Sequence, residues 1–205
     1  SGQGSNALIT VAGDPVNMIS GNVYHLERDI ALKGRGLPLV FERSYNSRTP
    51  KDGVLGYGWT HSFNHTLTFK DDNVDGATNA ADSDGVTSSV VWTDGTGADK
   101  IMPVSGNVGG VPAGATMTPP QGHFFTATRS AADNTYIITE KGGLSYVFEN
   151  VAGTVGQKAR LSAIKDRNGN KLTLTYTGIQ LTEIKDDLGR KLTLSYISNR
   201  ISEIS

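Results

Sequence analysis

A tandem repeat near the end of the chain constrains the fold more than any other feature. Residues 161–180 read LSAIKDRNGNKLTLTYTGIQ, residues 181–200 read LTEIKDDLGRKLTLSYISNR, and ISEIS opens a third copy, so the period is 20 residues. Self-similarity at a fixed period indicates a small unit that buries its apolar face only by stacking on its neighbours. The recurring residues are Leu161, Leu181 and Ile201, Ile164, Ile184 and Ile204, Asp166 and Asp186, Gly169 and Gly189, Leu172 and Leu192, Leu174 and Leu194, and Tyr176 and Tyr196.

Each copy reads as a strand, a turn and a second strand. The second strand alternates apolar and polar side chains, which is typical of a strand with one buried face. Asn168-Gly169 predicts a tight hairpin turn, because both residues tolerate positive φ. Leu161 and Ile164 are three positions apart, so a bulge is needed to bring both to one face. The sequence therefore predicts an all-β fold of successive antiparallel hairpins stacked into one sheet. The predicted buried row is Leu172, Leu174, Tyr176, Leu192, Leu194 and Tyr196.

The repeat resembles the RHS or YD repeats of bacterial surface proteins, polymorphic toxins and teneurins. The shared features are the phrase I-K-D-x-x-G-x-K-L-T-L-x-Y and its spacing. An upstream block, GDPVNMISGNVYHLERDIALKGRGLPLVFERSYNSRT followed by GVLGYGWTHSFNHTLTF, is similar to the segment that precedes those repeats. The resemblance implies a curved, spiralling sheet, part of a hollow shell that encloses or presents a C-terminal toxin or effector segment. It implies no catalysis by this portion, so we expect a structural module and not an enzyme.

Three parts are expected along the chain. Residues 1–6 are expected to be a cloning scar or a disordered tail. Residues 7–160 are expected to form the β domain that precedes the repeats, and residues 161–205 the repeats, with the third copy truncated. The outer backbone edge of the last strand, Ile201 to Ser205, is then expected to be unpaired and to offer a template for another strand.

Composition narrows the possible partners and the location. The formal net charge is −1, which gives no electrostatic footprint for nucleic acid or an anionic membrane. No run approaches the roughly 18 apolar residues of a membrane span, and cysteine is absent. The resemblance implies as partners the further repeats and the effector of the same chain, with secretion machinery or cell-surface glycans as others. It implies a secreted or cell-surface bacterial protein, or one exported by a contact-dependent delivery system.

The longest alternating run of the sequence lies at Trp59–Phe69 and predicts one strand with a buried aromatic face. His61 and His65 fall on that face. Residues four apart on a strand are separated by roughly 13 Å, too far to share one ion. We therefore interpret both as structural, hydrogen-bonded histidines. Upstream, residues 24–32 and 37–41 predict an antiparallel pair. Pro38 favours either an edge position for the second strand or a backbone nitrogen that faces outward.

The sequence holds no motif of nucleophilic, phosphate-binding or zinc-dependent catalysis. Asp94-Gly95-Thr96-Gly97 carries a carboxylate, but its strand-turn-strand context favours a plain turn over an acid–base site. An enzyme would need a pocket that brings His25 or His123 against a carboxylate.

One loop carries a ligand pattern for calcium. Residues 71–82 read DDNVDGATNAAD, which resembles the calcium loops of dockerins and thrombospondin repeats. Oxygen ligands at alternate positions around a glycine bend suit a hard cation. The alternative is a solvated turn cluster, because Asp, Asn and Gly favour turns in general. The expected calcium ligands are Asp71, Asn73, Asp75 and Asp82 through side-chain oxygens and Ala77 through its carbonyl, with Asn79 bridging through water.

A carbohydrate- or surface-binding β module is the alternative function. Its sugar platforms would be Tyr57, Trp59 and Trp92. Exposed and coplanar rings on one sheet face would favour this alternative, whereas burial of the rings would count against it.

Overall fold

The computed structural model describes residues 22–48, 51–70, 89–104, 111, 114–130, 132–151 and 158–205. These residues form an all-β fold, and the described part contains no helix, hence none that could cross a membrane. The strands are β1 (Tyr24–Leu32), β2 (Leu39–Asn46), β3 (Asp52–Gly53), β4 (Gly56–Tyr57), β5 (Trp59–His61), β6 (Thr66–Lys70), β7 (Ser89–Thr93), β8 (Asp99–Pro103), β9 (Thr116–Met117), β10 (Phe125–Arg129), β11 (Tyr136–Glu140), β12 (Ser145–Asn150), β13 (Lys158–Lys165), β14 (Lys171–Thr177), β15 (Gln180–Asp186), β16 (Lys191–Ile197) and β17 (Arg200–Ile204).

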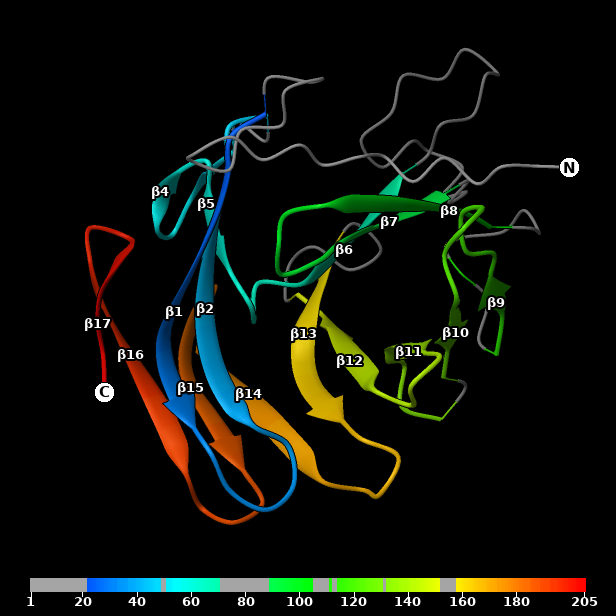
Figure 1. Cartoon of the computed structure of the whole chain (residues 1–205). Helices are drawn as coiled ribbons and strands as arrows, with labels where there is room; N and C mark the ends of the chain where they lie inside the picture. Colours follow the sequence, from blue (N-terminus) through cyan, green and yellow to red (C-terminus); the bar gives the residue numbers. More distant parts are fainter. Residues whose placement is uncertain are drawn as a thin grey trace, which may run out of the picture.

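Every strand pairing in the described residues is antiparallel, as the hairpin prediction requires. The main sheet has 12 strands and runs in the order β17 to β9, with β6, β7 and β8 branching from β13 (Figure 1). A three-stranded sheet of order β1-β2-β5 and the short β3-β4 pair complete the fold. The prediction of an all-β fold of antiparallel hairpins is confirmed.

The bulge predicted for the repeat is present in every copy. The register skips Ser162 opposite β12, Thr182 opposite β14 and Ser202 opposite β16, so the bulges recur with the period of the sequence. Each bulge turns the apolar residues on either side of it to the same face. As predicted, Leu172, Leu174, Leu192 and Leu194 are buried, whereas Tyr176 and Tyr196 are only half-buried.

The turn of each copy is longer than the predicted two-residue turn. In the first copy, the Asp166 carboxylate accepts hydrogen bonds from the N–H groups of Asn168 and Asn170 at 2.8 and 2.9 Å. Gly169 has φ 88° and donates its N–H to the Asp166 carbonyl at 3.1 Å. The aspartate therefore organises the turn, and the left-handed glycine closes it as a bulge.

Strand β13 is the branch point of the main sheet. Its first residues, Lys158 to Arg160, pair with β6, and its last residues, Ala163 to Lys165, pair with β14, while β12 follows its other edge. Strands β6 to β13 form a curved part of the sheet whose two ends are β8 and β9 (Figure 1). Between these ends, the N–H of Thr118, next to β9, donates to the carbonyl of Pro103 in β8 at 3.3 Å. One buried cluster lines both the curved part and the repeats, and includes Leu67, Trp92, Met117, Ile138, Phe148, Leu174 and Ile184.

The β1–β2 hairpin lies across β14, β15 and β16 and covers part of their apolar face (Figure 1). Leu39 and Phe41 of β2 belong to the same buried cluster as the repeat leucines. At the tip of this hairpin, Arg190 donates to the carbonyls of Leu32 and Leu37 at 3.1 and 3.2 Å. The upstream segment and the repeats are therefore packed as one body with a common core.

One strand prediction was wrong in part. The run Trp59–Phe69 is broken into β5 and β6 by a turn in which Asn64 donates its N–H to the His61 carbonyl at 2.8 Å. The Ser62 hydroxyl donates to the Val40 carbonyl at 3.1 Å and holds this turn against β2. Pro38 lies just before β2, whose residues Leu39 to Phe41 pair with β1 alone, while Arg43 to Tyr45 pair with β5 as well.

The edge at β17 differs from the expectation of an unpaired strand. The Ile201 N–H donates to the Val54 carbonyl at 2.9 Å. Arg200 Nη2 donates to both carboxylate oxygens of Asp52 at 2.7 and 2.8 Å, and Nη1 donates to the Gly53 carbonyl. The loop between β3 and β4 thus covers the start of β17.

Candidate functional site

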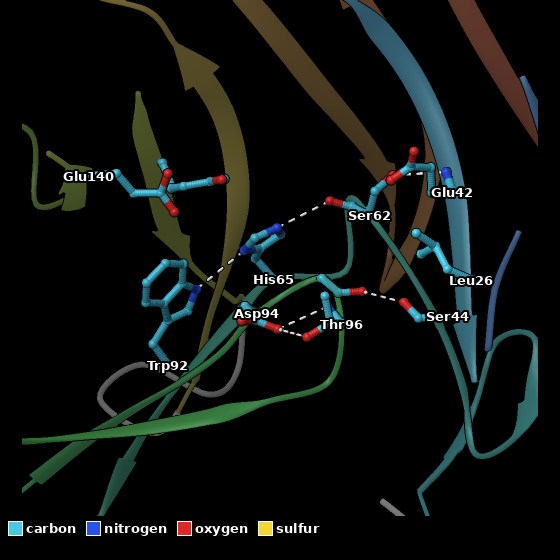
Figure 2. Close-up of a pocket in the computed structure, with 11 residues that line it drawn as sticks. Leu26, Glu42, Ser44, Ser62, His65, Trp92, Asp94, Thr96 and Glu140 are labelled. Carbon is cyan, nitrogen blue, oxygen red and sulfur yellow. Dashed lines mark hydrogen bonds between the residues drawn. The ribbon is translucent and has the colours of Figure 1, made fainter. Parts of the chain in front are cut away.

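One pocket of the described residues lies between β2, the β5–β6 turn and the β7–β8 turn. It is a pocket of about 270 Å³. Figure 2 shows carboxylates, hydroxyls and aromatic rings from distant parts of the chain converging on it. The lining residues are Leu26, Glu42, Ser44, Ser62, His65, Trp92, Asp94, Gly95, Thr96, Glu140 and Tyr146.

His65 is the centre of this pocket and is only 7% exposed. Its ring stacks on Tyr146 with centroids 4.6 Å apart and on Trp92 at 5.9 Å. The Trp92 indole N–H donates to His65 Nδ1 at 3.3 Å, so His65 Nε2 carries the proton and donates to the Ser62 carbonyl at 3.1 Å (Figure 2). Both ring nitrogens are therefore engaged in structural hydrogen bonds.

Burial determines the charge state of the two adjacent histidines. It lowers the pKa of His65 to about 4, although the Asp94 carboxylate acts in the opposite direction. Burial also lowers the pKa of His61 to about 3, and the neighbouring His65 adds to this shift. His61 stacks on Phe41 with centroids 5.0 Å apart and accepts the Phe63 N–H at Nδ1. The interpretation of both histidines as hydrogen-bonded structural residues agrees with this geometry.

Asp94 occupies a turn, as predicted, and its carboxylate is fully used there. One oxygen accepts the N–H groups of Thr96 and Ala98 at 2.9 and 3.1 Å, and the other accepts Lys100 Nζ. Burial alone would raise the pKa of Asp94, but the hydrogen bonds from Lys100 and Thr96 hold it below its usual value. Lys100 also lies over the Trp92 ring, 4.4 Å from its centroid. This carboxylate therefore holds a turn and pairs with a cation, and it does not act as a base.

Two further polar side chains of the pocket are also paired. Glu42 pairs with Arg28, and Ser44 donates to the Gly95 carbonyl at 3.4 Å. His65 is held as a neutral ring with both nitrogens bonded, so it is not a free base beside these hydroxyls. The residues that the sequence did not single out here are Glu42, Ser44, Ser62, Glu140 and Tyr146, because strand pairings between distant segments bring them together.

The other histidines named for an enzyme lie elsewhere. His25 pairs with Glu27 at 2.8 Å on an exposed face of β1. His123 is exposed and packs edge-on near Phe125, with centroids 6.2 Å apart. Neither lines the pocket around His65.

The predicted sugar platforms are not brought together. Trp92 is 2% exposed and lies inside the curved part of the sheet. Trp59 is half-buried, with Tyr45 and Arg43 against its ring at 5.4 Å. Tyr57 is exposed, but no ring contact joins it to another described aromatic residue. These three rings therefore do not form the exposed, coplanar set on one sheet face that a carbohydrate-binding module would need.

The predicted calcium ligands lie outside the described residues. These are Asp71, Asn73, Asp75, Ala77 and Asp82, all within 71–88. Among the residues that are described, no cluster of three or more carboxylate, histidine or cysteine side chains could hold a metal ion. Calcium binding by this loop stays a prediction.

A hydrogen bond from a tyrosine hydroxyl to a backbone carbonyl recurs with the repeat and was not predicted from the sequence. The Tyr176 hydroxyl donates to the Leu161 carbonyl at 2.8 Å, and the Tyr196 hydroxyl donates to the Leu181 carbonyl at 3.0 Å. In both cases the tyrosine lies on the neighbouring strand, 15 residues after the carbonyl that it bonds. The conserved spacing between the two copies was the available signal, but it was interpreted only as burial of the ring.

Comparisons with known proteins agree with the resemblance to RHS proteins. Residues 13–98 match the family described as "Domain of unknown function (DUF6531)". The chain is 44% identical over 61 residues to "Probable deoxyribonuclease RhsB" and 43% identical over 61 residues to "Probable deoxyribonuclease RhsA", both of Dickeya dadantii (strain 3937). The aligned part is 30% of this chain and 4% of each relative, so the chain spans a small fraction of their length.

Proposed function

From the premise that this chain is an RHS-type sequence, we propose that it is a non-catalytic structural module, the N-terminal part of an RHS/YD β-shell. In this proposal the shell encloses or presents a C-terminal toxin or effector segment. The chief support is that two consecutive copies build the same bulged hairpin and the same tyrosine contact. A unit that reproduces its own edge can be extended by further copies.

The position of the upstream segment supports a role at the beginning of the shell. The β1–β2 hairpin covers the apolar face of the first repeats, and Phe41 and Leu39 are fully buried there. A repeat array needs a terminal element that closes its first apolar face. The three-stranded sheet meets this need for β14 to β16.

The absence of catalysis is also part of the proposal. The relatives are named as probable deoxyribonucleases, but the chain aligns with 4% of each. His65, Asp94 and Glu42 of the pocket are engaged in stacking, a turn and an ion pair. A nuclease activity would therefore belong to another part of such a protein.

Partners and location follow from the same proposal. The partners are further repeats and an effector of the same chain, with secretion machinery or cell-surface glycans as external ones. The location is the cell surface or the medium, or a recipient cell reached by contact-dependent delivery.

Limited proteolysis of the complete open reading frame that contains this sequence tests the proposal. We expect the C-terminal segment to resist the protease in the intact protein and to be digested once the shell is denatured. The same segment expressed alone is the control and should be digested at once. Equal digestion in both contexts, or a reading frame without further repeats, would contradict the enclosing role.

A further inference from the structure

Asn168-Gly169 is the only Asn-Gly pair in the sequence, and it lies in the turn of the first repeat. An asparagine before glycine is chemically labile, because glycine has no side chain that shields its backbone nitrogen. Both residues are exposed, and a Cβ added to Gly169 would meet nothing within 4 Å. Within the described part of the chain, no hydrogen bond engages the side-chain amide of Asn168. This amide is therefore accessible to water and free to rotate.

The reaction open to this pair is deamidation through a cyclic imide. The Gly169 backbone nitrogen attacks the side-chain carbonyl carbon of Asn168 and loses its proton, and the amide nitrogen leaves as ammonia. Water then opens the imide at either carbonyl, which yields aspartate or isoaspartate. No oxidant and no enzyme are needed, because the nucleophile and the leaving group both belong to the chain and the solvent supplies the water.

The folded turn opposes this reaction at the attacking nitrogen. The Gly169 N–H donates to the Asp166 carbonyl at 3.1 Å, so the nitrogen that must attack keeps its proton in a hydrogen bond. Because φ of Asn168 is not positive, this bond makes Asn168 the third residue of a type I turn. Closure of the imide ring needs a rotation about the Cα–C bond of Asn168, and that rotation would break the turn.

The Asp166 carboxylate keeps the turn closed. It accepts the N–H groups of Asn168 and Asn170 at 2.8 and 2.9 Å, and the side-chain amide of Asn170 at 2.6 Å. The first of these bonds fixes the peptide group directly before the reactive side chain. Loss of the carboxylate would therefore free the rotation at Asn168 without changing any reacting atom.

The second repeat has the same turn without the reactive pair. Asp186 accepts the N–H groups of Leu188 and Arg190 at 3.0 and 2.8 Å, and Gly189 has φ 88°, as the glycine of the first turn does. Leu188 stands in the place of Asn168 and has no amide to lose. The chain therefore contains its own reference turn, in which the same backbone is chemically inert.

We propose that Asn168 is a site of spontaneous deamidation that Asp166 blocks in the folded chain, so that the modification marks molecules in which the β13–β14 hairpin has opened. Isoaspartate lengthens the backbone by a methylene group, so the bonds of the turn to Asp166 cannot all form again. The turn also lies against the upstream hairpin, since a Cβ added at Gly36 would stand 3.0 Å from Asn170 Oδ1. The modification is therefore irreversible and loosens the contact between the first repeat and the β1–β2 loop.

The test follows deamidation by fragmentation mass spectrometry, which assigns the mass gain of about 1 Da either to Asn168 or to Asn170. The full chain is incubated at mildly alkaline pH, folded and in urea, beside the variants Asp166→Asn and Asp166→Ala. Asp166→Asn keeps an acceptor oxygen for the two N–H groups, whereas Asp166→Ala removes it. We expect the rate at Asn168 to rise in the order parent, Asp166→Asn, Asp166→Ala and parent in urea. The rate of Asp166→Ala should exceed that of the folded parent by about tenfold.

Asp186→Ala is the matched control, because it removes the same acceptor from the second turn and leaves the first turn intact. Circular dichroism at the incubation temperature shows whether each variant is folded; if Asp166→Ala is not, Asp166→Asn and the parent in urea decide the question. A folded parent that deamidates as fast as the parent in urea would show that the turn gives no protection, and the inference would fail. It would fail equally if folded Asp166→Ala were no faster than the parent, or if Asp186→Ala accelerated the reaction at Asn168 as much as Asp166→Ala does.

Discussion

Gly95 of the β7–β8 turn lies close against the β5–β6 turn. A Cβ atom added there would lie 2.8 Å from the Ser62 carbonyl oxygen and 2.9 Å from His65 Nε2. We predict that Gly95→Ala lowers the free energy of unfolding by about 1–3 kcal/mol, because one of the two turns must shift. Urea unfolding measures the effect. Gly142→Ala is the matched control, since a Cβ there meets nothing within 4 Å, and an equal loss in both variants would contradict the prediction.

The buried histidines predict a loss of stability on mild acidification. Burial lowers the pKa of His65 to about 4 and that of His61 to about 3 in the folded state, against an ordinary value of 6.5. The unfolded chain therefore binds more protons below pH 6.5, so stability is full above that pH and falls toward pH 4. Each histidine contributes a slope of about 1.4 kcal/mol per pH unit in this window.

Urea unfolding between pH 7 and pH 4.5 measures this slope in the free energy of unfolding. His65→Gln removes one of the two titrating groups, so we expect its slope to be about half that of the parent chain. A parent chain whose stability is constant over this interval would show that the histidines are not buried as neutral rings.

The burial of single residues could be predicted from the sequence, but their partners could not. The alternation around His61 and His65 correctly indicated two buried histidines. The partners of His65 come from elsewhere, since Trp92 lies on β7 and Tyr146 on β12. Such contacts depend on which strands pair, and local periodicity carries no information about pairing between distant strands.

The calcium loop is an element whose function can be tested directly. If Asp71 to Asp82 bind calcium, millimolar calcium should raise the melting temperature by mass action, and Asp75→Ala should abolish the rise. Differential scanning calorimetry with and without calcium measures both. Magnesium at the same concentration is the control for general ionic effects, and titration calorimetry without a calcium-dependent heat would remove the hypothesis.

Among the elements, those defined by local chemistry were predicted best. The spacing of Leu161 and Ile164 was sufficient to predict the bulge, which the register shows at Ser162. The turn was predicted less well, because Asn168-Gly169 was considered without the carboxylate of Asp166, which accepts the turn N–H groups. The break between β5 and β6 was missed, since it depends on the contact of Ser62 with β2.

Over the whole molecule, Arg190 joins the upstream hairpin to the second repeat. It pairs with Asp186 at 2.6 Å and donates to carbonyls at the tip of the β1–β2 hairpin. We predict that Arg190→Met lowers the free energy of unfolding by about 1–3 kcal/mol, because the buried Asp186 carboxylate loses its partner and the part-buried Leu37 carbonyl loses its donor. Hydrogen exchange of the β1 and β2 amides should become faster in this variant.

Lys191→Met is the matched control for Arg190→Met. Lys191 neighbours Arg190, but its pair with Glu183 is largely exposed, with 57% of the lysine side chain accessible. Such a pair contributes about 0–1 kcal/mol. If the two substitutions cost the same, or if exchange in β1 is unchanged, Arg190 is not the joint between the two parts.

The branch point at β13 also limits where a duplication can add a repeat without disturbing the fold. The first residues of β13 pair with β6 and its last residues pair with β14. An insertion can therefore not shift β13 relative to these partners without breaking a pairing. A duplication of 20 residues that falls after Lys165 adds a hairpin and leaves all partners of β13 in register. The same duplication before Arg160 would separate β12 or β6 from β13 and open the shared core. Copy number is therefore free to vary on the β14 side alone, and related sequences should differ in length there.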